Sequence, residues 1–310
     1  MFTLAHLSDP HVSPLPRPRA AELAGKRVTG FLSWTFRRNA IHGGPVLDSL
    51  AADLQETAPD HIVVTGDIIN ISLPDEYTQA QTWLRSLGPP DRVTAIPGNH
   101  DAYVPMDWQH SIGLWADYMT GALPGGDDAR EQPVRSDDDF PFVRLRGPVA
   151  LVGVSTACPM PPFSAAGRIG ERQLGELNRR LQELGREGLF RVVLIHHPPF
   201  DGPAQRRKGL HDSAAFRAVI AEAGAELILH GHTHRSGLAK LPTPDGFAPV
   251  IGVPSASAKY AHDGRGHSQY HLYRITRDGN GWRIDVEVRG VVPALDSFVR
   301  EGQFSLAIPQ

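Results

Sequence analysis

The sequence predicts an α/β fold in which two sheets pack against each other with helices on the outside. In the first two thirds of the chain, short runs of apolar, largely β-branched residues alternate with longer segments whose apolar residues recur at helical spacing. Beyond His234 the chain changes to short alternating runs separated by turn residues, which is typical of antiparallel strands. We find no internal repeat or low-complexity linker, so we expect one domain over residues 1–292 and a C-terminal tail at 293–310.

The first part of the chain follows a strand, helix, strand rhythm. Apolar residues at helical spacing over 46–57, ending before Pro59, predict an amphipathic helix. A helix between consecutive strands is typical of a βαβ unit, so we expect these strands to pair in parallel. In chain order, the expected elements are a strand at 2–8, a helix at 46–57, a strand at 61–65, a helix at 75–87 and a strand at 93–96.

The later part of the chain is expected to add a buried strand at 149–154 and a charged amphipathic helix at 171–187. Asp278-Gly279-Asn280-Gly281 is a hairpin signal between two alternating runs. We expect these late runs and the run at 250–253 to be antiparallel strands that close one side of a second sheet. The other expected elements are a helix at 108–119 and strands at 142–145, 191–195, 226–229, 250–253, 267–275 and 282–288.

Residues 13–45, called the insert below, interrupt the connection between the first strand and the first helix. Several prolines argue against regular structure in its first part, so we expect an irregular segment. Because the insert follows the first strand directly, we expect it to form a lid over the strand ends. Its second part mixes large apolar and cationic side chains, namely Lys26, Arg27, Phe31, Leu32, Trp34, Phe36, Arg37 and Arg38.

Five predicted strands are followed at once by Asp, Asn or His side chains. The central example is Pro97-Gly98-Asn99-His100-Asp101, directly after the run at 93–96. Open α/β sheets place their chemistry at the carboxyl ends of strands. One such cluster alone is more often a solvated turn or a packed histidine, but five at strand ends indicate one shared site. The other four are Asp9-Pro10-His11, Gly66-Asp67-Ile68-Ile69-Asn70, His196-His197-Pro198-Pro199 and His230-Gly231-His232-Thr233-His234.

Composition argues against several classes of protein. The formal net charge is −3 and 21% of residues are charged, so no basic field favours a stable nucleic-acid partner. The single cysteine, Cys158, excludes an intrachain disulfide and is expected to be a small buried residue. No apolar run approaches the ~18 residues of a membrane span, and the chain opens on a strand, so we expect a cytoplasmic protein. The oligomeric state is left open.

The ordered set Asp-x-His, Gly-Asp-x-x-Asn, Gly-Asn-His-Asp, His and Gly-His-x-His resembles the motifs of calcineurin-like metallophosphoesterases over about residues 4–234. The resemblance implies a four-layer αββα sandwich of two mixed sheets and a pair of divalent ions bridged by Asp67. Carboxylate, amide and imidazole ligands suit manganese, iron or zinc, and magnesium is also compatible. By the same resemblance, the first ion is completed by Asp9, His11 and His234, and the second by Asn99, His196 and His232.

The resemblance also implies a mechanism. Two divalent ions lower the pKa of a shared solvent molecule, and the hydroxide attacks phosphorus in line. His100 is expected to contact the scissile phosphate and help to protonate the leaving oxygen, with Asp101 orienting its imidazole. The choice of His196 over His197 as a ligand depends on the family pattern alone.

Four further residues are candidate substrate contacts. Asn70 closes the Gly-Asp-x-x-Asn block and is expected beside the metal ligands, with a structural loop cap as the alternative. Three cations follow the His196 cluster and are expected near the mouth of the site. They are Arg206, Arg207 and Lys208.

Two substrate classes compete. Residues 26–38 resemble a short part of the lid of calcineurin-like UDP-diacylglucosamine pyrophosphatases, which favours a lipid-linked substrate and peripheral contact with the inner membrane. The Asp-Pro-His and His-His-Pro-Pro blocks resemble cyclic nucleotide phosphodiesterases, which favours a small soluble diester. The alternative for the aromatic residues of the insert is packing onto the core. A non-enzymatic, metal-binding interaction scaffold is a further hypothesis, although none of the seven expected ligands is replaced.

Overall fold

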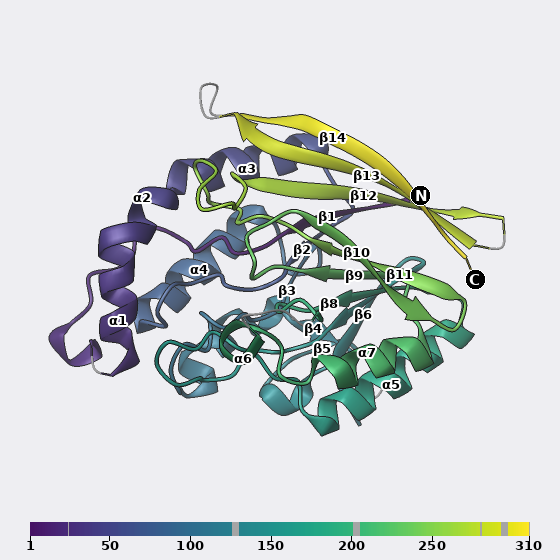
Figure 1. Ribbon diagram of the computed structural model, residues 1–310, viewed down its shortest axis with the longest axis horizontal. Coiled ribbons are helices and arrows are strands. Elements are labelled where there is room, and N and C mark those ends of the chain that lie inside the picture. The colour runs from purple at the N-terminus through teal and green to yellow at the C-terminus, as the bar shows by residue number, and fades with distance from the viewer. Residues whose placement is uncertain (24, 126–129, 201–204, 280, 293–296, 310) are drawn as a thin grey trace.

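The computed structural model describes residues 1–310 except 24, 126–129, 201–204, 280, 293–296 and 310. Two sheets of six strands each lie between helices in the described part of the chain (Figure 1). This arrangement confirms the expected mixed α/β sandwich.

The first sheet has the strand order β14-β13-β12-β1-β2-β3. Its strands β1 (Phe2–Leu7), β2 (His61–Val64) and β3 (Val93–Ala95) pair in parallel, as the strand and helix rhythm predicts. β12 (Gln269–Asp278) pairs antiparallel with β1, and β13 (Gly281–Val292) continues from it. The expectation that these late strands close a second sheet is therefore wrong for β12 and β13, because they extend the free edge of β1 instead. The late run at 250–253 does begin within the second sheet.

The segment expected as a separate tail also belongs to the first sheet. β14, Ser297–Ile308, pairs antiparallel with β13 and forms the edge of the sheet. Phe298 and Ile308, near its two ends, are buried in the core between the layers. The boundary at residue 292 therefore does not separate the described residues 297–308 from the domain.

The second sheet has the order β10-β11-β9-β8-β7-β6. Alternate residues of its central strand β8 (Phe190–Leu194) face opposite layers. Val192 and Leu194 pack toward the first sheet, whereas Val193 packs toward the outer helices. The other strands are β6 (Phe142–Arg146), β7 (Val149–Gly153), β9 (Leu227–His230), β10 (Gly237–Thr243) and β11 (Gly246–Gly252), with a small separate pair β4 (Thr120–Gly121) and β5 (Gln132–Pro133).

Helices cover the outer faces of both sheets. α3 (Gly44–Thr57) and α4 (Pro74–Leu87) pack on the first sheet, and α5 (Glu171–Arg186) and α7 (Ser213–Ala223) on the second. None of the described helices is both long and apolar enough to cross a bilayer. Shorter helices are α6 (Gln205–Lys208) and the 3-10 helices at Ala20–Glu22, Trp108–His110, Ile112–Tyr118 and Asp137–Asp139.

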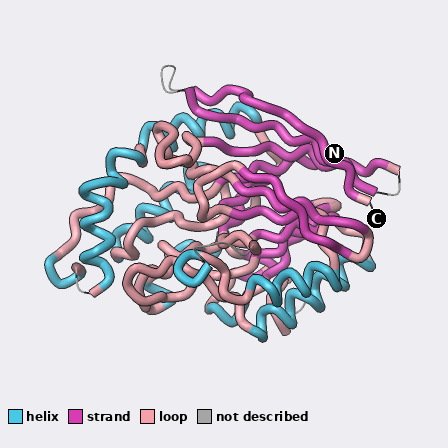
Figure 2. Tube along the Cα trace, viewed as in Figure 1, coloured by secondary structure: helices cyan, strands magenta, loops and turns pink. Residues whose placement is uncertain are grey.

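The second part of the insert is helical, not irregular as expected. α1 (Lys26–Ser33), a π-helical turn (Trp34–Arg38) and α2 (Asn39–Ile41) follow one another without a break. They form the helical arm at the end of the sandwich opposite the N-terminus (Figure 2). Backbone hydrogen bonds from Gly43 to Ser257 and from Lys259 to Ile41 fasten the arm to a loop of the core. The prolines in the first part of the insert therefore do not prevent helix formation at residues 26–41.

Candidate metal centre

The five polar clusters lie at the carboxyl ends of β1, β2, β3, β8 and β9. Because these strands are neighbours within each sheet, the loops that follow them meet. Backbone hydrogen bonds join the loops directly, from Asp9 N–H to the Gly66 carbonyl at 3.0 Å and from His11 N–H to the Asp67 carbonyl at 3.1 Å. A third, from Gly231 N–H to the His196 carbonyl at 3.1 Å, joins the two loops of the second sheet.

The backbone at this meeting point is strained, because several residues other than glycine have positive φ angles. These left-handed conformations are uncommon in residues other than glycine, cost about 1–3 kcal/mol each, and gather at functional sites. Gly66, with φ of 92°, also has no room for a side chain, since a Cβ would lie 2.6 Å from the Gly98 nitrogen. Positive φ angles of 42° to 67° occur at Asp9, His11, Asp67, His232 and His234.

Asp9, His11 and His234 form the first group of converging ligand atoms. His234 Nε2 lies 3.1 Å from Asp9 Oδ1 and 3.3 Å from His11 Nε2. The other nitrogen of His11, Nδ1, lies 3.1 Å from the Ile69 carbonyl, so a proton on Nδ1 leaves the Nε2 lone pair facing the group. Asp9 is fully buried, and its Oδ1 atom faces the His234 imidazole. Buried acceptors that face one another fit a bound cation.

Asn99, His196 and His232 form the second group. Asn99 Oδ1 lies 3.2 Å from His196 Nε2 and 2.9 Å from His232 Nδ1. His196 Nδ1 faces the Thr65 carbonyl at 2.7 Å, which leaves Nε2 free to bind an ion.

His197 lies close to the same group, since its ligand atom is within 4.8 Å of those of His196 and His232, but its ring has other partners. His197 Nδ1 lies 2.7 Å from the Thr156 hydroxyl and Nε2 lies 3.1 Å from the Ala165 carbonyl. Both of its ring nitrogens are therefore occupied by protein partners.

Asp67 lies between the two groups. Its Oδ1 atom is 3.4 Å from His196 Nε2, and its carboxylate forms a second close cluster with Asp9 and His11, all ligand atoms lying within 4.8 Å of one another. Burial works against ionisation, but the neighbouring His196 and His100 outweigh it and hold the pKa of Asp67 well below its usual value. Burial likewise opposes protonation of His196, yet Asp67 raises the pKa of His196 to about 9. In the absence of metal, the positive charge of a protonated His196 imidazole thus offsets the negative charge of Asp67, as a metal ion would.

A model of the calcineurin-like phosphoesterase family matches residues 2–236. The chain belongs to this family. It is 24% identical over 262 residues to a probable cyclic nucleotide phosphodiesterase of Synechococcus, covering 84% of this chain and 82% of the relative. It is 26% identical over 196 residues to the glycerophosphodiester phosphodiesterase GpdQ of Enterobacter lignolyticus, covering 63% of this chain and 56% of that relative. A dimetal phosphatase from Danio rerio shares the fold, with a TM-score of 0.62 at 15% identity over 96% of this chain and 98% of the other.

The family membership makes this metallophosphoesterase a hydrolase of phosphoric ester bonds, and enzymes of this class use two divalent ions. The two groups of ligand atoms and the carboxylate between them fit such a pair. All seven side chains expected as ligands from the sequence meet at this one place. They are Asp9, His11, Asp67, Asn99, His196, His232 and His234.

His100 lies beside the metal centre, but its expected partner Asp101 does not contact its ring. The His100 imidazole stacks on Tyr103, with ring centres 5.6 Å apart, and its Nδ1 hydrogen-bonds the Asn70 carbonyl. The Asp101 carboxylate instead accepts backbone N–H groups of Gly98, Ile68 and Ile69 at 2.7 to 3.0 Å. Asp101 therefore joins the loops after β2 and β3, and the expectation that it orients His100 is wrong.

The described candidates for substrate contact either have protein partners or are exposed. Asn70 is fully buried and its side-chain amide donates to the Val12 carbonyl at 3.0 Å, as the loop-cap alternative requires. Arg207 donates to the Phe163 carbonyl, and Lys208 is exposed. The side chain of Arg206 lies outside the described residues.

Two residues of the insert reach the metal centre and were not identified as site residues from the sequence. Arg38 Nη2 lies 2.8 Å from His11 Nδ1, and Arg38 Nη1 lies 3.4 Å from His100 Nδ1. The buried ring of His42 lies beside those of His11 and His234. Neither follows a predicted strand, and the only local signal is the run Arg37-Arg38-Asn39-Ala40-Ile41-His42.

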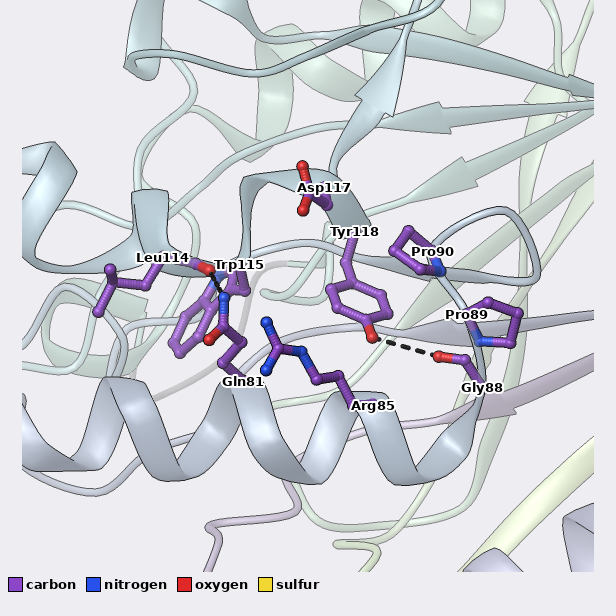
Figure 3. A pocket seen from close by; sticks show the side chains of 9 residues that line it. All are labelled: Gln81, Arg85, Gly88, Pro89, Pro90, Leu114, Trp115, Asp117 and Tyr118. Carbon is purple, nitrogen blue, oxygen red and sulfur yellow. Dashed lines mark hydrogen bonds between the residues drawn. The ribbon is translucent and has the colours of Figure 1, made fainter.

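A pocket of about 270 Å³ lies away from this centre, between α4 and the 3-10 helix Ile112–Tyr118 (Figure 3). Gln81 and Arg85 line one side and Trp115 and Tyr118 the other. No residue of the metal centre lines it, and its walls bring together no set of metal ligands. The chemistry of converging side chains, not the size of a cavity, therefore identifies the functional site.

Proposed function

We propose that this metallophosphoesterase hydrolyses a phosphodiester or diphosphate bond in a lipid-linked substrate, for which UDP-diacylglucosamine is the test compound. The supporting observation is an apolar stripe on the insert made by Val28, Leu32 and Phe36. These side chains are 42%, 49% and 78% exposed, and their spacing of four residues aligns them along the helical arm. The same arm carries Arg38 to the metal centre. An apolar face next to cations suits the boundary between acyl chains and phosphates.

The reaction follows from the arrangement of the side chains. Two divalent ions, when bound, activate water and offset the charge of the phosphate. His100 Nδ1 is held by the Asn70 carbonyl, so Nε2 is the nitrogen that faces substrate and moves a proton to the leaving oxygen. Arg38 binds a phosphate oxygen beside His100. Asp9, His11 and His234 would hold one ion and Asn99, His196 and His232 the other, with Asp67 between them.

A small soluble diester is the second candidate substrate. The names of both relatives support it, since one is called a cyclic nucleotide phosphodiesterase and the other a glycerophosphodiester phosphodiesterase. For such substrates the apolar stripe has no role in binding. The same metal centre and His100 would perform the hydrolysis.

The deciding experiment measures kcat/KM on a substrate panel with Mn²⁺. The panel contains detergent-dispersed UDP-diacylglucosamine, cyclic AMP, glycerophosphocholine and bis(p-nitrophenyl) phosphate, with chelator-treated protein as the control. We expect kcat/KM for the lipid-linked diphosphate to exceed that for cyclic AMP at least tenfold. Cleavage of the soluble diesters without the lipid would overturn the lipid proposal and leave the second candidate.

A further inference from the structure

We propose that His42 is an additional ligand of the ion held by Asp9, His11 and His234, and that it makes the insert part of the metal centre. This inference does not depend on the identity of the substrate. It starts from a group of three buried histidines, two from the motif loops and one from the insert. The ligand atoms of His11, His42 and His234 lie within 4.8 Å of one another.

The ring positions agree with a single ion. Two imidazoles that bind one ion through bonds of about 2.1 Å keep their ring centres within roughly 6.5 Å of each other. The ring centres are 4.8 Å apart for His11 and His42, 5.3 Å for His11 and His234, and 6.0 Å for His42 and His234. All three separations meet the condition, and the rings meet at steep angles of 47° to 81° instead of stacking.

The two nitrogens of His42 have different surroundings. Nδ1 lies 2.7 Å from the Ser257 hydroxyl, which orients the ring. Nε2 has no hydrogen-bond partner among the described residues, although the residue is only 3% exposed. Metal-binding histidines are commonly held in this way, with one nitrogen fixed by a neighbouring polar group and the other on the ion.

The segment that orients His42 also orients an expected ligand. The Ser255 hydroxyl donates to the Asp9 carbonyl at 2.6 Å, two residues before Ser257. The backbone N–H of Gly43 donates to the Ser257 carbonyl, which fixes the chain directly after His42. One short loop thus sets the positions of Asp9 and His42 together, as a shared ion requires.

Ligation by His42 would couple the insert to metal binding. The Trp34 ring stacks parallel to that of His42, at 10° with centres 6.3 Å apart, and Trp34 is buried. The His42 N–H donates to the Arg38 carbonyl at 3.0 Å. An ion on His42 therefore orders the part of the insert that carries Trp34 and Arg38, and by linkage an ordered insert strengthens binding of that ion.

The test is titration of metal-free protein with Co²⁺, followed by visible absorption and calorimetry. We expect His42→Ala to weaken one of the two Co²⁺ sites at least about tenfold and to change the absorption of that ion alone. Added imidazole should restore both properties. The matched control is His110→Ala. This change removes a histidine whose side chain is 82% exposed on the 3-10 helix Trp108–His110, so the variant should bind Co²⁺ as wild type does.

A second readout separates ligation from a purely structural role. In wild type, Co²⁺ should change the fluorescence of Trp34, identified by its loss in Trp34→Phe, and this change should disappear in His42→Ala. Far-UV circular dichroism checks that each variant is folded, and His42→Gln, which retains a hydrogen-bonding side chain, serves as a second variant. Two sites with wild-type affinity and spectrum in both variants would overturn the proposal. So would weakened binding that imidazole does not restore.

Discussion

A guanidinium nitrogen of Arg38 lies 2.8 Å from Nδ1 of His11, so a cation of the insert reaches a buried histidine of the metal centre. The same Nδ1 atom lies 3.1 Å from the Ile69 carbonyl. A histidine that binds an ion through Nε2 carries its proton on Nδ1 and donates it to such a carbonyl. Arg38 then finds no acceptor on His11, and its N–H groups become available to a phosphate oxygen.

Replacement of Arg38 should therefore weaken catalysis without loss of metal. A hydrogen bond to a charged group contributes about 1.5–3 kcal/mol, so we expect Arg38→Ala to lower kcat/KM roughly 10- to 100-fold. Arg38→Lys should lose less activity, because lysine keeps the positive charge. It should not match wild type, because lysine lacks the planar guanidinium group. Steady-state kinetics and metal analysis by mass spectrometry measure the two effects. The matched control is Arg37→Ala, whose side chain is 75% exposed and pairs with Asp263 at 3.4 Å. Metal loss in Arg38→Ala would contradict the assignment.

His100→Ala should lower kcat far more than metal content. Its Nδ1 is fixed on the Asn70 carbonyl, so the ring is positioned for proton transfer and not for ligation. Loss of a general acid commonly lowers the rate about 10²- to 10⁴-fold. Turnover of bis(p-nitrophenyl) phosphate and metal stoichiometry, measured on the same sample, decide the matter. A parallel fall in both quantities would assign His100 to metal binding.

The two carboxylates of the centre should differ in their effect on metal content. Asp67 lies between the two groups of ligand atoms, whereas Asp9 contacts His234 of the first group. We expect Asp67→Ala to lose both ions and Asp9→Ala to retain one, measured as metal per chain after gel filtration. Chelation of wild type should abolish activity, and Mn²⁺ should restore it. One tightly bound ion in Asp67→Ala would argue against a shared ligand.

The apolar stripe should matter only for a lipid substrate. We expect the triple change Val28→Ser, Leu32→Ser and Phe36→Ser to raise KM for detergent-dispersed UDP-diacylglucosamine about tenfold or more, because each apolar side chain contributes binding energy when buried. Activity on bis(p-nitrophenyl) phosphate should stay unchanged. Leu238→Ser on β10 is the control, since Leu238 is similarly exposed at 56% but lies outside the insert. Equal kinetics of the triple variant and wild type on the lipid would remove the role of the stripe.

Acid should destabilise the fold through His61, which is remote from the metal ligands. Burial, followed by the nearby Arg144, lowers the pKa of His61 to about 2, and its Nε2 lies 2.7 Å from the Thr94 hydroxyl. Between this pKa and the ordinary value near 6.5, the unfolded chain binds more protons than the folded one, so stability is complete above about pH 6.5 and falls as pH decreases.

The measurement is urea unfolding of metal-free protein at pH 7.5 and pH 5. We expect wild type to lose roughly 2 kcal/mol more of its free energy of unfolding than His61→Gln over this range. An equal loss in both proteins would show that His61 is protonated in the folded state.

The sequence by itself predicted the sheet core from local patterns, and its resemblance to the family predicted the seven expected ligands. Apolar runs predicted β1, β2 and β8, and polar residues directly after them lie at the same edge of a sheet wherever the strands pair in parallel. The pairing of the late strands β12, β13 and β14 was less predictable. The sheet that β12 joins depends on the free edge of β1, and strand formation at residues 297–308 depends on the partner strand β13. The local alternation of apolar and polar residues contains neither piece of information.

Only the tertiary structure decided which partners Arg38, His42 and Asp101 contact. Asp101 neighbours His100 in the chain, yet its carboxylate is taken by three backbone N–H groups of two loops. Arg38 and His42 meet His11 because a helical arm folds back over the strand ends. The physical reason is that a side chain's role depends on which donors and acceptors surround it after folding, and residues far apart in sequence supply these partners.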